Sequence, residues 1–142
     1  MRLLFTKGRG PIGRLISWAL ESEMSHVVIE HHGLVFHSNF WGVHAMPIEQ
    51  FLQKATVIQV VEIDLTWREL MTTFNKYWHS KYDFLAFAHL GIRALLKKAG
   101  LKLPKANLWQ VTGMFLCTEW VSRTLHGTEQ TLTPEQLYER LR

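Results

Sequence analysis

An α+β fold, with a small antiparallel sheet packed against helices, is predicted by three features of this 142-residue sequence. Short β-branched runs follow one amphipathic helix and precede several longer helical segments, so strands and helices occupy separate parts of the chain. The length fits one domain over 1–142, large enough to bury roughly 68% of the surface that its unfolded form exposes. No repeat, linker or low-complexity tract divides the chain, so we expect a single core.

The strands are indicated by short runs of β-branched and apolar residues between turn residues. The predicted strands cover residues 26–30, 34–37, 41–46 and 57–63. The first two flank the turn-like sequence His31-His32-Gly33 and therefore predict a hairpin. Pro47 is expected to end the third strand, because proline cannot donate to a sheet.

The helices are indicated by apolar residues at helical spacing and by capping residues. They are expected from Pro11 to Leu20, over residues 48–52, 67–78 and 84–99, from about Cys117 to Gly127, and from Pro134 onward. Residues 104–113 are expected to form a loop. Thr133 and Gln136 have the spacing of a capping box around Pro134, which predicts where the last helix begins.

Composition limits the cellular setting and the classes of partner. The net charge of +4 is too small to predict nucleic-acid binding, and the single cysteine excludes an internal disulfide. No run approaches the roughly 18 apolar residues of a membrane span, and the apolar run near Met1 is too short for a signal peptide. We therefore expect a cytoplasmic protein that needs other means of delivery if its substrate lies in the cell wall. The sequence does not predict an oligomeric state.

Cys117 is the first candidate for a reactive group. It stands in the first turn of a predicted helix, where unpaired N–H groups and the helix dipole lower the pKa of a thiol and favour the thiolate. The alternative is a buried core thiol, because Cys117, Val121 and Leu125 share one apolar helix face. The pattern of residues alone leaves both interpretations open.

His26 and His37 are candidates for the base and its orienting group. If His31 and His32 alone form the turn, His26 lies directly opposite His37, close enough for one ring to orient the other. A three-residue loop with a bulge at Gly33 would instead place the two rings on opposite faces. Glu30 is a weaker third member, because four residues along a strand span about 13 Å.

The order of these motifs resembles the circularly permuted NlpC-type papain-like superfamily, in which histidine-bearing strands precede the cysteine-bearing helix. The likeness covers most of the chain. The matching segments are Gly10–Val27, Trp41–Val43 with Pro47–Leu52, Tyr82–Phe84, Cys117–Glu119 and Thr133–Leu137. The resemblance implies that Cys117 is the nucleophile, His26 the base and His37 the residue that orients it. Thr118 departs mildly from the serine that relatives often carry there.

The resemblance implies a cysteine hydrolase that works through a covalent acyl-enzyme. Members of the superfamily cleave peptidoglycan stem peptides and other amides, while relatives such as the lecithin-retinol acyltransferase-like proteins transfer acyl groups on lipids. The expected partner is therefore a small peptide, amide or acyl-lipid substrate, with no cofactor and no metal. We further expect a His26 ring nitrogen within about 4 Å of the Cys117 sulfur. Both histidines should project from the sheet face that meets the cysteine helix.

Two other interpretations of the sequence are alternatives to the hydrolase. The first is a metal-binding protein, whose potential ligands are His26, His31, His32, His37 and Cys117. The second is a catalytically inactive module that contacts an anionic membrane surface or a protein partner. This interpretation depends on a run of basic and apolar residues between Ile92 and Trp109. The same run is also typical of a solvent-exposed helix C-terminus, where basic residues complement the helix dipole.

Overall fold

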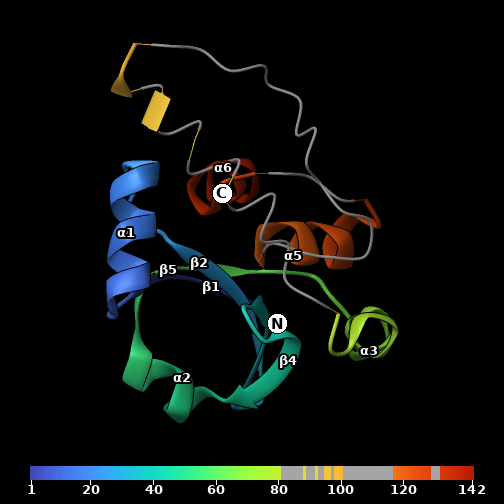
Figure 1. Ribbon diagram of the computed structural model, residues 1–142. Helices are drawn as coiled ribbons and strands as arrows, with labels where there is room; N and C mark the ends of the chain where they lie inside the picture. Colours follow the sequence, from blue (N-terminus) through green and yellow to red (C-terminus); the bar gives the residue numbers. More distant parts are fainter. Residues whose placement is uncertain (81–87, 89–91, 93–94, 97, 101–116, 129–131) are drawn as a thin grey trace.

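The computed structural model describes residues 1–80, 88, 92, 95–96, 98–100, 117–128 and 132–142, and these form a mixed α+β structure (Figure 1). The predicted α+β class, with a small antiparallel sheet packed against helices, is confirmed. The five strands form one antiparallel sheet in the order β4-β3-β2-β1-β5. They are β1 (Arg2–Gly8), β2 (His26–His31), β3 (Leu34–Asn39), β4 (Gly42–Pro47) and β5 (Ala55–Glu62).

The first strand, β1, is absent from the sequence prediction although it lies between β2 and β5. Its apolar residues are split between the two sides of the sheet. Leu3 and Phe5 are fully buried on one side, and Leu4 is buried on the other. A strand buried on both sides has a continuous apolar run instead of an alternating one, so its periodicity gives no strand signal.

The helices among the described residues are α1 (Pro11–Leu20), α2 (Ile48–Lys54), α3 (Trp67–Tyr77), α5 (Cys117–His126) and α6 (Pro134–Leu141). The predicted capping box at α6 is confirmed, since the Thr133 hydroxyl accepts from the Gln136 N–H and the Gln136 side chain accepts from the Thr133 N–H. Most of the predicted helix over residues 84–99, and the predicted loop over 104–113, lie outside the described residues.

The two faces of the sheet carry different layers (Figure 1). On the first, here called the α5 face, side chains from α3, α5 and α6 pack on the sheet around the fully buried Trp120 and Leu70. On the second, the α2 face, Phe51 of α2 packs with Leu4, Val28, Val35 and Ala55. Because side chains alternate along a strand, neighbouring residues of β2 belong to different faces.

The hairpin between β2 and β3 has a two-residue turn. His32 and Gly33 have φ values of 48° and 80°, and two positive values are the mark of a type I′ turn. The pairs Ile29↔Phe36 and His31↔Leu34 shift the register by two residues from the expected one. The expected direct pairing of His26 with His37 is therefore wrong, and so is the Gly33 bulge. A shift of two keeps both histidines on one face.

Candidate functional site

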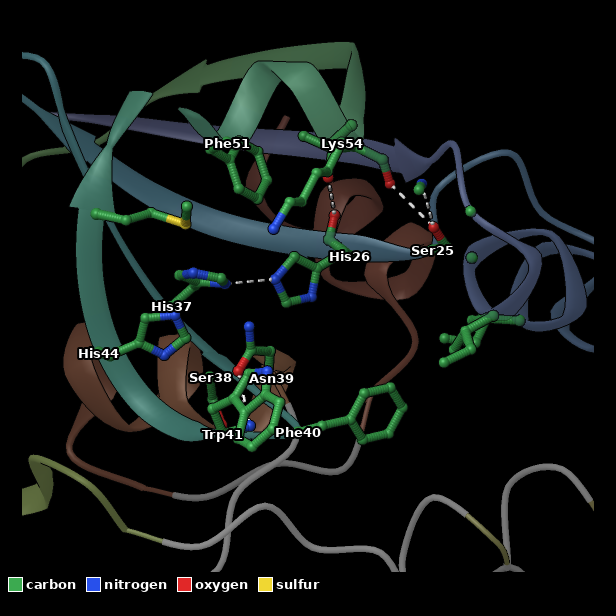
Figure 2. Close-up of a pocket in the computed structure, with 18 residues that line it drawn as sticks. Ser25, His26, His37, Ser38, Asn39, Phe40, Trp41, His44, Phe51 and Lys54 are labelled. Carbon is green, nitrogen blue, oxygen red and sulfur yellow. Dashed lines mark hydrogen bonds between the residues drawn. The ribbon is translucent and has the colours of Figure 1, made fainter. Parts of the chain in front are cut away.

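His26 and His37 form the centre of a candidate site on the α2 face (Figure 2). Nε2 of His26 lies 3.0 Å from Nδ1 of His37, so one ring donates a hydrogen bond to the other, with the direction set by the tautomers. The rings meet edge to face, with centroids 5.2 Å apart. They reach each other diagonally across the hairpin instead of directly, which long side chains can do. The expected contact between the two rings is confirmed by this geometry.

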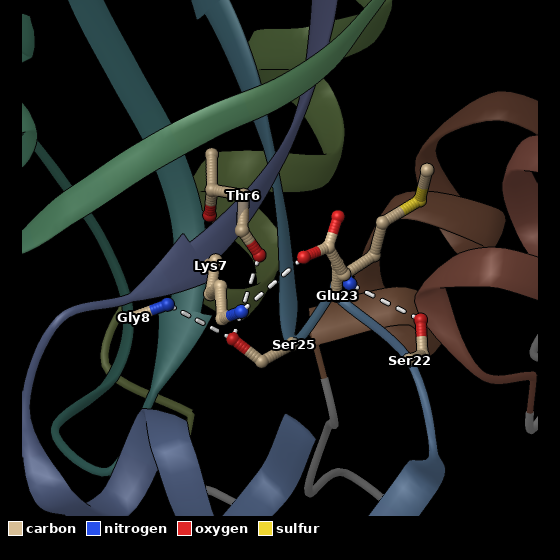
Figure 3. Close-up of polar contacts among 7 residues, drawn as sticks. Thr6, Lys7, Gly8, Ser22, Glu23 and Ser25 are labelled. Atoms are coloured by element: carbon tan, nitrogen blue, oxygen red, sulfur yellow. Dashed lines mark hydrogen bonds and ion pairs between the residues drawn. The ribbon is translucent and has the colours of Figure 1, made fainter. Parts of the chain in front are cut away.

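Ser25 directly precedes His26 and is hydrogen-bonded to the end of β1 (Figure 3). Its hydroxyl accepts a hydrogen bond from the Gly8 N–H at 3.0 Å, and its own N–H donates to the Thr6 carbonyl at 2.9 Å. These bonds tie the first residues of β2 to the end of β1, where Thr6 pairs with His26. The imidazole is thus held by a strand in the interior of the sheet, which supports precise positioning better than a loop does.

The histidines open into a cavity of about 400 Å³. Its volume suits a small organic ligand or part of a larger one. Lys54 lines the same cavity and extends over the histidines in Figure 2. The apolar part of the lining comes from Ile12, Ile16, Phe40, Trp41, Met46 and Phe51. A mostly apolar lining around a few polar groups is typical of a binding site.

Both central imidazoles are neutral at physiological pH. Burial, assisted by the nearby His44, lowers the pKa of His26 to about 4. Burial is also the largest cause that lowers the pKa of His37, to about 2. The neighbouring imidazoles of His26 and His44 lower it further. Nε2 of His37 is buried and has no hydrogen-bond partner among the described residues. An unpartnered polar atom inside a pocket indicates a place for a ligand atom or water.

His44 belongs to this cluster and was missed in the sequence analysis. It pairs directly with His37 across β3 and β4, and the two ring centroids are 4.4 Å apart. Its Nδ1 lies 3.0 Å from the Gly42 carbonyl, which fixes the ring. A two-residue turn at Phe40 and Trp41 would have predicted this pairing by the register argument used for the first hairpin.

Glu30 takes no part in the cluster. Its carboxylate accepts hydrogen bonds from Arg2 Nε at 2.7 Å and from the Gly33 N–H at 3.1 Å. The Arg2 guanidinium lowers the pKa of Glu30 from its usual value. The carboxylate therefore ties β1 to the hairpin turn, at the opposite end of β2 from His26.

Cys117 is the first residue of α5 and packs on the α5 face with Val27 and Trp120. Its side chain is 8% exposed. Burial raises the pKa of the Cys117 thiol to about 11, against the opposing effect of the N–H groups of Val27, Thr118 and Cys117 itself. The expected lowering of this pKa is wrong, because burial outweighs the favourable amides at the beginning of the helix.

The Cys117 thiol and the His26 imidazole lie on opposite sides of β2, on either side of the peptide unit that joins His26 to Val27. The Val27 N–H is directed at the sulfur, and this amide is bonded to His26. Val27 faces α5, whereas His26 faces Phe51 of α2, with ring centroids 6.3 Å apart. The expectation that both histidines project toward the cysteine helix is therefore wrong, and the expected contact of about 4 Å between a His26 ring nitrogen and the Cys117 sulfur is not found among the described residues. Alternation along β2 separates the two groups.

Among the described residues, no cluster of three or more histidine, cysteine or acidic side chains is arranged to hold a metal ion. No helix within the same part of the chain is long and apolar enough to cross a membrane. The sequence matches no known protein-family model, and a search of curated proteins finds no relative. The candidate site therefore rests on its own geometry.

Proposed function

We propose that this chain is a cysteine hydrolase with a permuted NlpC-type papain-like fold, in which Cys117, His26 and His37 act together. The observation that carries this proposal is the 3.0 Å contact between Nε2 of His26 and Nδ1 of His37. An orienting group on one ring nitrogen leaves the other nitrogen to take a proton from a nucleophile. Nδ1 of His26 has no hydrogen-bond partner among the described residues, and we assign it to the thiol.

The protonation states favour general-base catalysis over a preformed thiolate–imidazolium pair. With the thiol pKa at about 11 and the His26 pKa at about 4, both groups are neutral at rest. In the first step a bond forms between the Cys117 sulfur and the substrate carbonyl carbon while the thiol proton passes to His26. His26 then gives this proton to the leaving amine, alcohol or thiol. Water, deprotonated by His26, then attacks the acyl carbon. The carbon–sulfur bond breaks, the carboxylic acid leaves, and His26 returns the proton to the Cys117 sulfur.

The amides around the sulfur supply the electrostatic part of the mechanism. The N–H groups of Cys117, Thr118 and Val27 all lower the thiol pKa, so they favour negative charge on the sulfur as its proton leaves. Cys117 does not line the cavity and lies on the other side of β2 from His26, so the reaction requires the thiol to reach Nδ1 of His26 while His26 keeps its contact with His37.

The surface of the cavity supports one class of substrate. We propose an amide, ester or thioester whose acyl part is apolar, because apolar atoms make up the larger share of the cavity surface. Peptidoglycan stem peptides are the first amides to test, and acyl lipids are the alternative. The exposed apolar residues at the rim of the cavity favour the acyl lipids, as argued below.

The direct test is intact-protein mass spectrometry after exposure to activated esters and thioesters of short and long acyl chains. Wild-type protein should gain the mass of one acyl group on Cys117, and Cys117→Ser should gain none under the same conditions. His26→Ala should accumulate the adduct at least about 10²-fold more slowly. Acylation of lysines alone, at equal rates in all three proteins, would rule out the nucleophile.

A further inference from the structure

Helix α1 exposes the apolar residues that its amphipathic pattern predicts to be buried. Ile12, Leu15 and Trp18 are 50%, 58% and 54% exposed, and they follow one another along the helix at intervals of three residues. The Lys98 ammonium lies 3.8 Å from the centre of the Trp18 ring and covers part of it. Residues three apart lie next to each other on a helix surface, so the three form a continuous ridge. A contiguous apolar ridge on a soluble domain marks a surface for interaction.

The close approach of α1 to β1 fixes which side of the helix is exposed. A Cβ atom added to Gly13 would lie 2.6 Å from the Gly8 Cα, so only glycine permits this contact. Gly13 therefore faces the strand, and Ile16 lies beside it at the cavity wall. Leu15 and Trp18 cannot turn inward unless this backbone contact is broken.

The ridge is continuous with the rim of the cavity. Ile12 belongs to both, and it lines the cavity together with Phe40 and Trp41. Trp41 is 84% exposed although it is the largest apolar side chain in the turn between β3 and β4. Figure 2 shows Phe40 and Trp41 beside the histidine cluster. Exposed tryptophans beside a cavity are typical of proteins that sit at a lipid–water interface.

The charges around the ridge are suited to an anionic surface. Arg9, Arg14 and Lys54 are exposed and form no ion pair with a described carboxylate. The acidic residues nearby are engaged with lysines. Glu23 lies 3.5 Å from Lys7 and Glu21 lies 3.9 Å from Lys98. The unpaired charge beside the ridge is therefore positive, which attracts anionic lipid headgroups.

We propose that the α1 ridge docks on the headgroup region of an anionic phospholipid bilayer and turns the mouth of the cavity toward the membrane. Ile12, Leu15, Trp18 and Trp41 enter the interface, while Arg9 and Arg14 contact lipid phosphates. The substrate of the cavity is then an acyl lipid drawn from that bilayer. This last step rests on the proposed hydrolase function, whereas the docking does not.

Vesicle co-sedimentation tests the docking with the full chain. Wild-type protein should bind vesicles of phosphatidylcholine mixed with phosphatidylglycerol and bind pure phosphatidylcholine at least about tenfold more weakly. Leu15→Glu should weaken binding to the anionic vesicles about tenfold or more, since it replaces buried apolar area with charge. Arg14→Gln should weaken binding to the same vesicles about fivefold, and binding to neutral vesicles should not change.

Val60→Glu is the matched control. Val60 is 48% exposed and lies in β5, away from α1, so this variant adds the same charge at a similarly exposed apolar position. It should bind anionic vesicles as the wild type does, with thermal unfolding used to check that both glutamate variants fold. Equal losses in Leu15→Glu and Val60→Glu would overturn the docking surface. A solution dimer that Leu15→Glu dissociates would also overturn it, since a second copy would then cover the ridge.

The same experiment separates docking from chemistry. Cys117→Ser should sediment with anionic vesicles as wild type does, because the thiol lies on the other face of the sheet. If Cys117 is acylated by soluble thioesters but no variant binds vesicles, the docking is wrong and the hydrolase stands. If vesicles bind but no acyl adduct forms, the hydrolase is wrong and the docking stands.

Discussion

The two faces of the sheet bury their side chains in different ways. The α5 face is a closed apolar core around Trp120 and Leu70, both fully buried. The α2 face has only a small apolar cluster with Phe51, and beside it the histidine cluster lines a cavity. Among the described residues, the α5 face therefore holds the larger buried core, while the α2 face has room for a ligand.

The difference between the faces determines the ionisation of the candidate site. The thiol of Cys117 belongs to the closed face, and burial raises its pKa to about 11. The imidazoles belong to the open face, yet each ring is enclosed enough for burial to lower its pKa. Burial acts against the charged form of each group, so a thiol and an imidazole shift in opposite directions. The Cys117 thiol and the His26 imidazole are therefore both uncharged at neutral pH.

The largest expected effect is on the stability of the closed face. Trp120→Ala should lower the free energy of unfolding by about 3–5 kcal/mol, because it removes a fully buried ring from a packed core. Phe51→Ala, on the open face, should cost about 2–3 kcal/mol, because its ring already borders a cavity. Urea denaturation measures both. Equal losses would mean that the two faces are packed alike.

The second effect concerns catalysis at the open face. His26→Gln should lower kcat/KM for an activated ester by about 10²–10⁴-fold, because glutamine cannot accept the thiol proton. His32→Asn is the matched control, since His32 is exposed in the hairpin turn and has a φ of 48° that asparagine tolerates. Steady-state kinetics should show no change for this control. A similar loss in both variants would indicate a folding defect instead of a lost base.

The third effect tests the enclosure of the thiol. With its pKa raised to about 11, Cys117 should react with iodoacetamide at neutral pH about 10²-fold more slowly than a free thiol. The rate should climb as pH rises toward that pKa. Labelling that occurs only in denaturant would mean that Cys117 is a core residue and would contradict the proposed hydrolase. Labelling followed by mass spectrometry gives these rates. Rapid alkylation of the native protein at neutral pH would show that the α5 face is open at Cys117.

The smallest effect is a pH dependence of stability. Since the folded pKa of His26, about 4, lies below its unfolded value of 6.5, the unfolded chain binds more protons between these limits. Stability should therefore be complete above pH 6.5 and fall by roughly 1–3 kcal/mol as pH drops toward 4.

Chemical denaturation at several pH values measures this slope. His37→Gln should make it shallower, because the pKa of His37 is lowered in the same sense and glutamine does not titrate. His126→Gln, an exposed histidine of α5, should leave the slope unchanged. An identical slope in both variants would locate the proton uptake elsewhere in the molecule.

Local chemistry in the sequence was sufficient for several features of this protein. The β-branched run after His26 and the turn-like sequence His31-His32-Gly33 predicted the hairpin, though not its register, because backbone preferences act over a few residues. The capping box at Thr133 predicted the beginning of α6 for the same reason. The shared face of His26 and His37 was one of two alternatives that the sequence left open, and it survives the observed register because a shift of two preserves the face.

Tertiary structure alone decided the rest. The position of β1 inside the sheet depends on pairing with residues far along the chain, and a run buried on both sides has no periodicity to show it. The exposure of Leu15 depends on the contact between Gly13 and Gly8, which no helical pattern contains. The sign of the Cys117 pKa shift also lies beyond sequence, since the helix start favours the thiolate while burial in the assembled core opposes it more strongly.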